Sequence, residues 1–569
     1  MAGNKSLRSA EKAGGYISKL TFNNGKELEI AANDIVVFVG PNNAGKSQSL
    51  KDIYALSKAK TPSVVISDVE ISKYTQAIST ILSQVSVGEK YDSCTKYNYL
   101  GESLFVYSNT DSDYPQTGLH ADYRDLFVAN LDTSARLNIC KPPSNIRRDQ
   151  SKKHPIHYAA FEGKYRKWLS DSFKKAFNIE ITPNTQFGSE IPLCIGKPVQ
   201  LKGTYEDEQS RQEAYAAILE TYKQVQNQGD GIKSFTGILL YLMLDYYCTY
   251  LIDEPESFLH PPQARIMGQI IGNTLSGQQQ AFISTHSEDI IKGLLEVCPE
   301  RIKIVRITRE DDTNHFSILN NSEFNHVWND PLLKYSNIMA SLFHKTVVLC
   351  ESDSDCKLYS IIESHIKQKE GKYSETLFIH CGGKHRMSKI VSALRSLDIN
   401  VKLIPDIDVL NDKEVFKGIV ESFGIDFESI QSDYNNIVSN LHSPIEKINR
   451  NSAKIAINQI LDNSANAYLS IKEIKNIREV ISTISKWDNL KSAGTTALPA
   501  GNATASYKTI DQLLKSNGIY IVPVGELECF VKEVGGHGPE WVNKVLETYP
   551  DLDDAVYKKI TDFISSMNI

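Results

Sequence analysis

The stretch "DIVVFVGPNNAGKS", residues 34–47, joins an apolar run directly to a turn rich in glycine and asparagine. The β-branched and aromatic residues of 34–39 predict a buried strand, and residues 40–47 fit the pattern G-x-x-x-x-G-K-[ST]. Gly40 and Gly45 permit backbone angles that turn amide groups inward around phosphate oxygens, while Lys46 supplies a cation. A helix beginning at Lys46 points its positive end at the same phosphates. The stretch therefore predicts a nucleotide-binding P-loop.

The length and composition of the chain limit what kind of protein it is. With 569 residues it exceeds a single hydrophobic core, so we expect roughly two to four domains. Its formal net charge of −7 means that contact with nucleic acid must come from a local patch. The nine cysteines form no CxxC pair, which is typical of reduced thiols without a zinc site. Because we find no signal-like or membrane-spanning apolar run, we expect a soluble, cytoplasmic protein without membrane contact.

Two later motifs supply groups that act beside a P-loop. "YLIDEPESFLHP", residues 250–261, predicts a strand that ends on Asp253 and Glu254. The aspartate suits magnesium binding next to the phosphates, and the glutamate suits polarising an attacking water. "AFISTHS", residues 281–287, predicts a second strand that places His286 where it can sense the γ-phosphate.

This combination resembles the ABC-type ATPases, including their SMC and recombination-mediator branches. The resemblance implies that Asp253 is the Walker B aspartate, Glu254 the catalytic glutamate and His286 the switch histidine. It places the signature helix at "GDGIKSFTGILLYL", residues 229–242, which lacks LSGGQ; Ser234 is the candidate contact, and a helix N-cap serine is the alternative. The implied nucleotide contacts are Gly40, Asn42, Asn43, Gly45, Lys46, Ser47, Gln48, Ser234 and Asp253, with Ser47 and Asp253 on the magnesium ion.

The long separation between the P-loop and Asp253 predicts inserted elements over about 55–228. Residues 206–228 predict one polar helix, and 88–135 predict loops or a small sheet rather than core. Residues 141–175 hold ten Lys or Arg against three acids, with interleaved aromatics (Tyr158, Tyr165 and Trp168) that can stack on bases. The candidate nucleic-acid contacts are Arg147, Arg148, Lys152, Lys153, Lys164, Arg166 and Lys167, and a solvated helix face is the alternative.

A second pattern of strands and helices begins near residue 345. "KTVVLCESDSDCKLYSIIESHI" predicts a strand that ends at Glu351 and then a helix. "ETLFIHCGGKHRMSKIVSALRSLDI" repeats that plan around a glycine pair, and "NVKLIPDIDVLND" adds a strand ending on Asp406 and Asp408. Alternating strands and helices predict a parallel sheet, whose ligands gather at the strand carboxyl ends. The three carboxylates would repel one another there unless divalent cations lay among them.

A glutamate after the first strand, a glycine pair after the second and D-x-D after the third resemble a Toprim domain. That fold occurs in topoisomerases, some primases and nucleases of the overcoming-lysogenization-defect (OLD) family. D-x-D alone is usually a pair of solvated acids, so the order and spacing of all three features carry the resemblance. The first turn, "ESDSD", departs from the family, because Ser352 stands where glycine is usual while Asp355 fills the acidic position.

The remaining segments extend this resemblance. Residues 436–515 predict a helical insertion, with a flexible link at 491–508, and "NGIYIVPVGELECFV", 517–531, predicts a closing strand. The OLD resemblance implies a late acidic ligand, for which Glu528 is preferred and Glu526 is the second candidate. It also implies a late lysine, matched by Lys544, with a surface lysine as the alternative.

The order of motifs over nearly the whole chain resembles the OLD-family ATP-regulated nucleases, which include the Gabija nuclease and effectors encoded beside retron reverse transcriptases. We expect an α/β protein with an ABC-type P-loop ATPase domain over 1–340 and a Toprim parallel-sheet domain over 341–569. The resemblance implies ATP and Mg²⁺ or Mn²⁺ as cofactors, DNA as substrate, and a homodimer or tetramer formed through the ATPase half. It further implies an antiviral role, with a reverse transcriptase and its retron nucleic acid, or a helicase, as partner.

The function that follows is metal-dependent cutting of DNA gated by ATP. The implied catalytic residues are Glu351, Asp355, Asp406, Asp408, Glu526, Glu528, Lys544, Glu254 and His286. Of these, Glu351, Asp406, Asp408 and Glu528 would hold two metal ions about 4 Å apart. The alternative is a non-cleaving, ATP-dependent DNA clamp or recombination-mediator-like protein whose Toprim module binds metal and DNA. A topoisomerase is disfavoured because we find no separate domain for an active tyrosine, and a primase because no zinc module is present.

Overall fold

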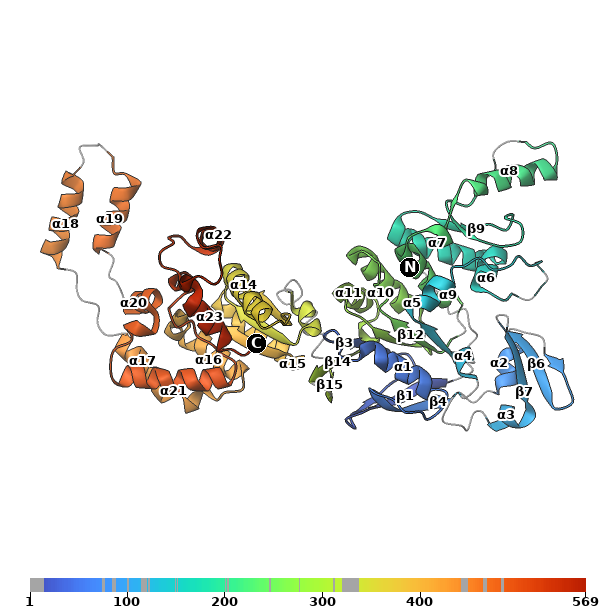
Figure 1. Ribbon diagram of the computed structural model, residues 1–569, viewed down its shortest axis with the longest axis horizontal. Coiled ribbons are helices and arrows are strands. Elements are labelled where there is room, and N and C mark those ends of the chain that lie inside the picture. The colour runs from blue at the N-terminus through green and yellow to red at the C-terminus, as the bar shows by residue number, and fades with distance from the viewer. Residues whose placement is uncertain are drawn as a thin grey trace. The chain divides into compact units, whose positions relative to one another are not determined.

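The computed structural model describes most of the chain in two compact units, 1–326 and 327–569 (Figure 1). The described residues are 15–73, 77–83, 88–99, 102–113, 120, 123–148, 150, 152–199, 201, 204–244, 247–275, 277–310, 313–319, 337–441, 449–463, 468–481 and 486–569. Within these ranges no helix is both long and apolar enough to cross a membrane.

The first unit is built on a six-stranded sheet in the order β15-β14-β3-β13-β12-β8. Only β15 runs antiparallel to its neighbour, and the other pairs are parallel. Every residue of β3 and β13 is buried, as expected for parallel strands covered on both faces. The strands are β3 Ile35–Val39, β8 Val128–Leu131, β12 Thr249–Asp253, β13 Gln280–Ser284, β14 Ile302–Glu310 and β15 Thr313–Ile318.

The helices around this sheet follow from its connections. Helix α1, Lys46–Leu56, begins directly after the P-loop, and α9, Asp230–Met243, precedes β12. Helix α10, Pro261–Thr274, precedes β13 in the sequence, and α11, Glu288–Leu295, follows it. The two helices pack against each other. Helix α5, Thr133–Asn138, packs against α9.

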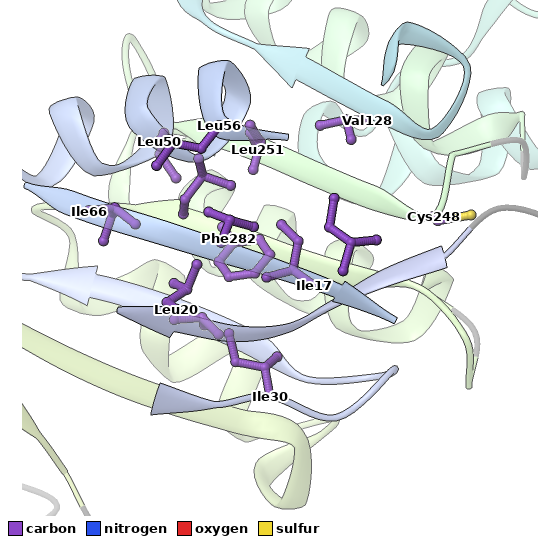
Figure 2. Close-up of a cluster of buried hydrophobic side chains, with 14 of the residues drawn as sticks. Ile17, Leu20, Ile30, Leu50, Leu56, Ile66, Val128, Cys248, Leu251 and Phe282 are labelled. Carbon is purple, nitrogen blue, oxygen red and sulfur yellow. The ribbon is translucent and has the colours of Figure 1, made fainter. Parts of the chain in front are cut away.

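A smaller antiparallel sheet, β2-β1-β4, completes the core around α1. Figure 2 shows Ile17, Leu20 and Ile66 from this sheet gathered with side chains of α1 and of the central sheet, Phe282 among them. Burial of each such side chain stabilises the fold by about 1.5–3 kcal/mol, so this cluster holds α1 in place against β12 and β13. The strands are β1 Gly15–Phe22, β2 Glu27–Glu29 and β4 Ile66–Lys73.

The inserted elements differ in part from the sequence prediction. A small antiparallel sheet, β5-β6-β7, confirms the predicted small sheet, but its Tyr97 and Val106 are buried in the same hydrophobic cluster as α1, so their assignment outside the core was wrong. The same predicted range also contains β8, which is an edge strand of the central sheet, so its assignment outside the core was wrong. Four residues, "VANL", are too few to show strand periodicity. The elements are α2 Ile78–Leu82, β5 Glu89–Lys90, β6 Cys94–Tyr99, β7 Glu102–Tyr107, α3 Ser108–Asp113 and α4 Arg124–Phe127.

The single polar helix predicted over 206–228 is also wrong at its end. Helix α8 stops at Glu220, and the chain then forms β11, whose Gln224 pairs with Cys194 of β10. Val225, just beyond, is fully buried, so packing overrides the local helix propensity. The elements here are α6 Pro155–Phe161, α7 Gly163–Phe177, β9 Ile181–Pro183, β10 Leu193–Ile195, α8 Glu208–Glu220 and β11 Lys223–Gln224.

The second unit contains a parallel sheet in the order β17-β16-β18, which confirms the prediction for this region. Helices α14 and α15 form the crossovers between its strands. Buried side chains including Tyr359, Trp541 and Phe563 join α14 to the C-terminal helices α22 and α23. The elements are β16 Thr346–Cys350, α14 Asp353–Lys369, β17 Thr376–His380, α15 Met387–Ser396, β18 Asn400–Ile404, α22 Gly538–Thr548 and α23 Lys558–Ser565.

The closing strand predicted at 517–531 is wrong: residues 519–522 form a short extended segment with one isolated bridge, Leu403 to Ile519, and Leu527–Phe530 is a 3₁₀ helix. The segment nevertheless runs beside the end of β18, because Val522 N donates to Pro405 O at 3.0 Å and Ile407 N donates to Gly525 O at 3.0 Å. Pro405 and Pro523 have no amide hydrogen, so a continuous ladder cannot form. The segment still carries the late acids to the carboxyl end of the sheet.

The helical insertion consists of amphipathic helices, as predicted. The link predicted to be flexible at 491–508 is instead the end of α20, a 3₁₀ turn at Gly494–Ala497 and the start of α21. Gly494 has φ +64°, and a Cβ there would lie 2.1 Å from the Pro523 carbonyl oxygen. Close packing therefore orders a tract whose composition suggested a loop. The helices are α16 Lys413–Ser422, α17 Gln431–Leu441, α18 Arg450–Asp462, α19 Ile471–Ile481, α20 Lys486–Ala493 and α21 Asn502–Ser516.

Candidate functional site

The P-loop follows β3 in a conformation that requires glycine. Gly40 has φ +140°, and a Cβ there would lie 1.9 Å from the Ile307 carbonyl oxygen of β14. Gly45 has φ +103° and directly precedes α1, while Asn43 between them also has a positive φ of 60°. Positive φ at Gly40, Asn43 and Gly45 thus gives the loop the tight turn that a phosphate-binding loop requires. Asn42 and Asn43 are exposed on its outer side, and Gln48 donates to Asp52 of its own helix at 2.8 Å.

Lys46 lies over this loop and is only 4% exposed. Its ammonium donates to the carbonyl oxygens of Gly40 at 2.9 Å and Pro41 at 2.6 Å. Burial lowers the pKa of Lys46 to about 8, while the carboxylates of Glu254, Glu256 and Asp253 act in the opposite direction. Lys46 and the end of β12 therefore lie close enough to interact electrostatically. Ser47, the predicted magnesium contact, is the next residue of α1 and is partly buried.

The end of β12 presents Asp253 and Glu254 toward β13. The Ser284 hydroxyl donates to Asp253 Oδ1, and Glu254 N donates to the Ser284 carbonyl at 2.9 Å. Glu254 has φ +46°, which is uncommon for a residue with a side chain, and such strained conformations cluster at functional sites. The His286 Nε2 lies 4.0 Å from Glu254 Oε1. Burial, and then Lys46, lower the pKa of His286, while Glu254 and Asp253 raise it.

Two further residues of this site were missed by the sequence analysis. Arg136 of α5 is fully buried and donates to the Asp253 main-chain oxygen and to Thr133 Oγ1, the latter at 3.1 Å. Burial lowers the pKa of Arg136, and Asp253 is the largest of the opposing acids. Glu256 accepts a hydrogen bond from His286 N at 2.7 Å, and burial raises its pKa. Arg136 belongs to no motif and lies 117 residues from Asp253, so no sequence signal linked them.

Ser234 lies inside α9, because the helix begins at Asp230 with Gly229 as its N-cap. The alternative that Ser234 caps this helix is therefore wrong. Its hydroxyl is buried and has no hydrogen-bond partner among the residues the structure describes. Gly237, one turn later, packs so closely on α5 that a Cβ would lie 2.2 Å from the Arg136 carbonyl oxygen.

In the second unit six carboxylates gather at the carboxyl end of the parallel sheet. Glu351 follows β16, Asp406 and Asp408 follow β18, and Glu526 and Glu528 follow the extended segment beside it. Burial first, and then Asp355, Glu351, Asp408 and Glu526, raise the pKa of Asp406 well above its usual value. We call Glu351, Asp355, Asp406, Asp408, Glu526 and Glu528 the acidic centre.

Local backbone geometry positions the first acids of this centre. Gly382 and Gly383 have φ +68° and +110°, and Gly383 N donates to the Glu351 carbonyl at 3.2 Å. The glycine pair thus folds over the end of β16, where a residue with a side chain would be strained. Asp355 Oδ2 accepts from Ser352 N at 2.7 Å in a capping box that starts α14. One oxygen of Asp355 is therefore already committed to the helix, and Ser352 serves as its N-cap.

Two lysines that the sequence analysis did not select lie among these acids. Lys384 Nζ lies 3.1 Å from Asp408 Oδ2, and Lys491 Nζ lies 3.2 Å from Glu526 Oε2. Burial lowers the pKa of Lys491, but hydrogen bonding to Glu526 and the charges of Asp408 and Asp406 give a net increase. Lys384 directly follows the glycine pair, and Lys491 lies in the tract predicted to be a flexible link.

The donor groups of the acidic centre suit a divalent cation. Glu351 Oε2 and Asp408 Oδ1 are buried and have no hydrogen-bond partner in the described parts of the chain. One set of three side chains, Glu526, Glu528 and His537, has ligand atoms that all lie within 4.8 Å of one another. Among the described residues, no three of the predicted ligands Glu351, Asp406, Asp408 and Glu528 reach that spacing. Oxygen ligands of this kind are those that Mg²⁺ and Mn²⁺ prefer.

Lys544 lies on the exposed side of α22. Its Nζ is 4.0 Å from the position that a Cβ of Gly536 would occupy, so it lies beside the loop that precedes α22. The same loop is tied to the acidic centre, because Gly538 N donates to Glu528 Oε1 at 2.9 Å.

Part of the basic segment makes contacts within the first unit. Arg166 donates to the carbonyl oxygens of Ala159 and Ala160 and so caps the end of α6. Lys152 and Lys164 lie 3.3 and 3.9 Å from Glu162, and each also lies over a tyrosine ring. Tyr165 is buried against Tyr158, so its predicted stacking on a base is wrong. The predicted contacts that are exposed are Arg147, Arg148, Lys153, Lys164 and Lys167.

Residues 342–408 match the family model described as "Overcoming lysogenization defect protein-like, TOPRIM domain". This range contains Glu351, the glycine pair and both aspartates of D-x-D. The second unit contains an OLD-like Toprim domain. The predicted resemblance to the OLD family is thereby confirmed, as is the fold class, an α/β chain with a P-loop sheet followed by a Toprim sheet.

Two curated proteins are similar to parts of the chain. The Old nuclease of Escherichia phage P2 is 22% identical over 325 residues, which are 54% of this chain and 49% of that protein. An ATP/GTP phosphatase of Helicobacter pylori is 35% identical over 77 residues, 13% of this chain and 21% of that protein. The chain thus spans half or less of the length of these relatives.

Solved structures of SMC heads resemble the chain in part. The SMC head domain from Thermotoga maritima is 13% identical, with a TM-score of 0.28, over 53% of this chain and 99% of that chain. An SmcHead bound to the C-winged helix domain of ScpA is 13% identical, with a TM-score of 0.34, over 54% of this chain and 99% of that chain.

Proposed function

We propose that this chain is an ATP-regulated, divalent-metal-dependent DNA nuclease. The observation that carries the proposal is the acidic centre, six carboxylates from separate stretches of the second unit that meet at one sheet edge; four of them, Glu351, Asp355, Asp406 and Asp408, lie within the match to the OLD-like Toprim domain. Mutual repulsion and burial make six neighbouring carboxylates unfavourable unless cations bind among them. Carboxylates gathered around divalent cations are the usual form of a metal centre for phosphodiester chemistry. The similarity to the Old nuclease of phage P2 supports the same activity.

The residues of the acidic centre would divide the work as follows. Glu351, Asp406, Asp408 and Glu528 would hold Mg²⁺ or Mn²⁺, which supplies activation of water and stabilisation of the leaving oxygen. Lys384 orients Asp408 through their ion pair, and Lys491 does the same for Glu526.

The exposed lysines and arginines would contact the DNA backbone. Lys544 lies beside the loop that carries Glu528's hydrogen-bond donor, where an ammonium would offset charge on a scissile phosphate. In the first unit, Arg147, Arg148, Lys153 and Lys167 remain exposed for phosphate contacts.

The first unit would bind ATP and thereby regulate cutting. Lys46 and the backbone of the P-loop would contact the phosphates, with Ser47 and Asp253 on the nucleotide's magnesium ion. Glu254 would polarise water, and His286, 4.0 Å away, would sense the γ-phosphate. We further propose that two copies associate through this unit, and that the biological role is antiviral defence beside a reverse transcriptase or a helicase.

The decisive experiment is cleavage of supercoiled plasmid with Mg²⁺ or Mn²⁺, with and without ATP. Asp406→Ala and Asp408→Ala should each reduce cutting by roughly a hundredfold or more, because each removes a metal-binding carboxylate. Glu414→Ala is the matched control, because this exposed acid lies six residues beyond Asp408 and outside the acidic centre. Cutting that survives both substitutions would reject the proposal, and DNA binding without cutting would favour a non-cleaving clamp.

A further inference from the structure

A histidine lies directly beside the last two acids of the acidic centre. His537 immediately precedes α22, and its Nδ1 lies 3.6 Å from Glu528 Oε1. The ligand atoms of Glu526, Glu528 and His537 all lie within 4.8 Å of one another. We call these three residues the Glu–Glu–His set. Their ligand atoms lie closer together than those of any three of Glu351, Asp406, Asp408 and Glu528 among the described residues.

The loop around His537 holds the set in place. Gly536 and Gly538 flank the histidine with φ +123° and +66°, and Gly538 N fixes Glu528 Oε1 through a hydrogen bond of 2.9 Å. His537 is 79% exposed, whereas Glu528 is only 18% exposed. A metal ion that approaches from solvent would therefore meet the imidazole and two carboxylates that are already in place.

Charge in the surrounding centre independently indicates a cation. Six carboxylates are accompanied by two lysines, Lys384 and Lys491, whose ammonium groups lie 3.1 Å from Asp408 and 3.2 Å from Glu526. Glu351 Oε2 and Asp408 Oδ1 remain buried without a hydrogen-bond partner among the described residues. Hydrogen-bond donors in the described residues thus leave one carboxylate oxygen of Glu351 and one of Asp408 without a partner.

We propose that Glu526, Glu528 and His537 together bind one transition-metal ion, and that His537 makes this position select Mn²⁺ over Mg²⁺. Mg²⁺ takes oxygen ligands almost exclusively and keeps much of its water, whereas imidazole nitrogen favours the transition metals. The set offers two oxygen ligands and one nitrogen ligand, so removal of the nitrogen should weaken Mn²⁺ far more than Mg²⁺. This inference rests on the proposed metal-dependent function and names the residue that sets its metal preference.

The test is Mn²⁺ binding to the full chain without nucleotide, measured by electron paramagnetic resonance, with Mg²⁺ affinity measured by competition. His537→Ala should weaken one Mn²⁺ site by roughly tenfold or more, with less than about a threefold change for Mg²⁺. Modulation of the Mn²⁺ spin echo by a directly bound nitrogen-14 should be present in the wild type and absent from the variant. Because the side chain is largely exposed, the variant should melt like the wild type.

His315→Ala is the matched control. His315 is 55% exposed, and its Nε2 lies 3.9 Å from Glu310 Oε2 in the first unit. The substitution therefore removes a similar imidazole beside a glutamate, but outside the second unit. The Mn²⁺ affinity and nitrogen-14 modulation of the His315→Ala variant should equal those of the wild type. If His537→Ala keeps wild-type Mn²⁺ affinity or nitrogen modulation, the inference is wrong.

Failure of this inference and failure of the proposed nuclease give different results. A chain that binds Mn²⁺ through His537 but cuts no plasmid supports the metal site and rejects the nuclease. A chain that cuts plasmid while His537→Ala retains full Mn²⁺ affinity rejects only the metal site.

Discussion

At the scale of single residues, both centres keep charged groups where burial opposes their charge. Burial lowers the pKa of Lys46 to about 8 and raises the pKa of Asp406 well above its usual value. Under the proposed function, a ligand of opposite sign would stabilise the charged form of each group: phosphate for Lys46 and a metal cation for Asp406. The two residues point to different ligands for the same physical reason.

Lys46→Ala should weaken nucleotide binding by roughly 10- to 150-fold, because it removes a charge-assisted hydrogen bond of about 1.5–3 kcal/mol. Isothermal titration with ATP and Mg²⁺ measures the loss. Lys51→Ala is the control, because Lys51 lies on the same helix but is exposed. Equal ATP affinity in Lys46→Ala and the wild type would contradict the P-loop assignment.

At the scale of elements, helix starts are built from the same side chains that line the sites. Asp355 caps α14 through Ser352 N, and Glu528 accepts from Gly538 N at the start of α22. These carboxylates lie at the positive ends of helices, where negative charge is favoured by roughly 0.3–1 kcal/mol. Hydrogen bonds at helix starts thus position part of the acidic centre.

A pH-dependent cap lies at the start of α6, where His154 Nδ1 accepts a hydrogen bond from Ile156 N at 3.2 Å. Burial, and then His157, lower the pKa of His154 to about 4, below the usual 6.5 of the unfolded chain. The folded state therefore disfavours the proton, and stability is full above pH 6.5 and is lost as the pH falls toward 4. The loss is about 1.4 kcal/mol per pH unit in that window.

His154→Asn keeps a cap acceptor that does not titrate. Chemical unfolding of the first unit at pH 7.5 and pH 5 should show about 2 kcal/mol more acid destabilisation in the wild type than in the variant. His157, whose Nδ1 accepts from Lys153 N, and the nearby Lys152 are unchanged in both proteins. Identical pH dependence in the two proteins would exclude His154 as the titrating group.

The sequence predicted those features that depend on neighbouring residues. Fixed spacing identified the P-loop and D-x-D, and alternation of strands with helices predicted the parallel sheet of the second unit. Arg136, Lys384 and Lys491 were missed because their partners lie far away in the sequence and no local pattern marks them. His537 could have been suspected only from its place between glycines shortly after Glu528.

At the scale of the whole molecule, each unit has its own hydrophobic core and, under the proposed function, would bind its own kind of ligand. The first unit carries the P-loop on a six-stranded sheet, and the second carries the acidic centre, four of whose six carboxylates lie within the match to the OLD-like Toprim domain. Anionic nucleotide and divalent metal should therefore stabilise different parts of one chain. A ligand at about 100 times its dissociation constant stabilises the unit it binds by about 2.7 kcal/mol.

Calorimetry of the full chain should show two unfolding transitions that respond to different ligands. With Mg²⁺ present throughout, ATP should raise the midpoint of the first-unit transition by about 5 °C, while Mn²⁺ without nucleotide should raise the second. Lys46→Ala should abolish only the ATP shift, and Asp406→Ala should reduce only the Mn²⁺ shift, because each removes a group from one unit. A single transition that both ligands move together would show instead that the two units unfold as one cooperative body, so that nucleotide binding and metal binding are linked through stability.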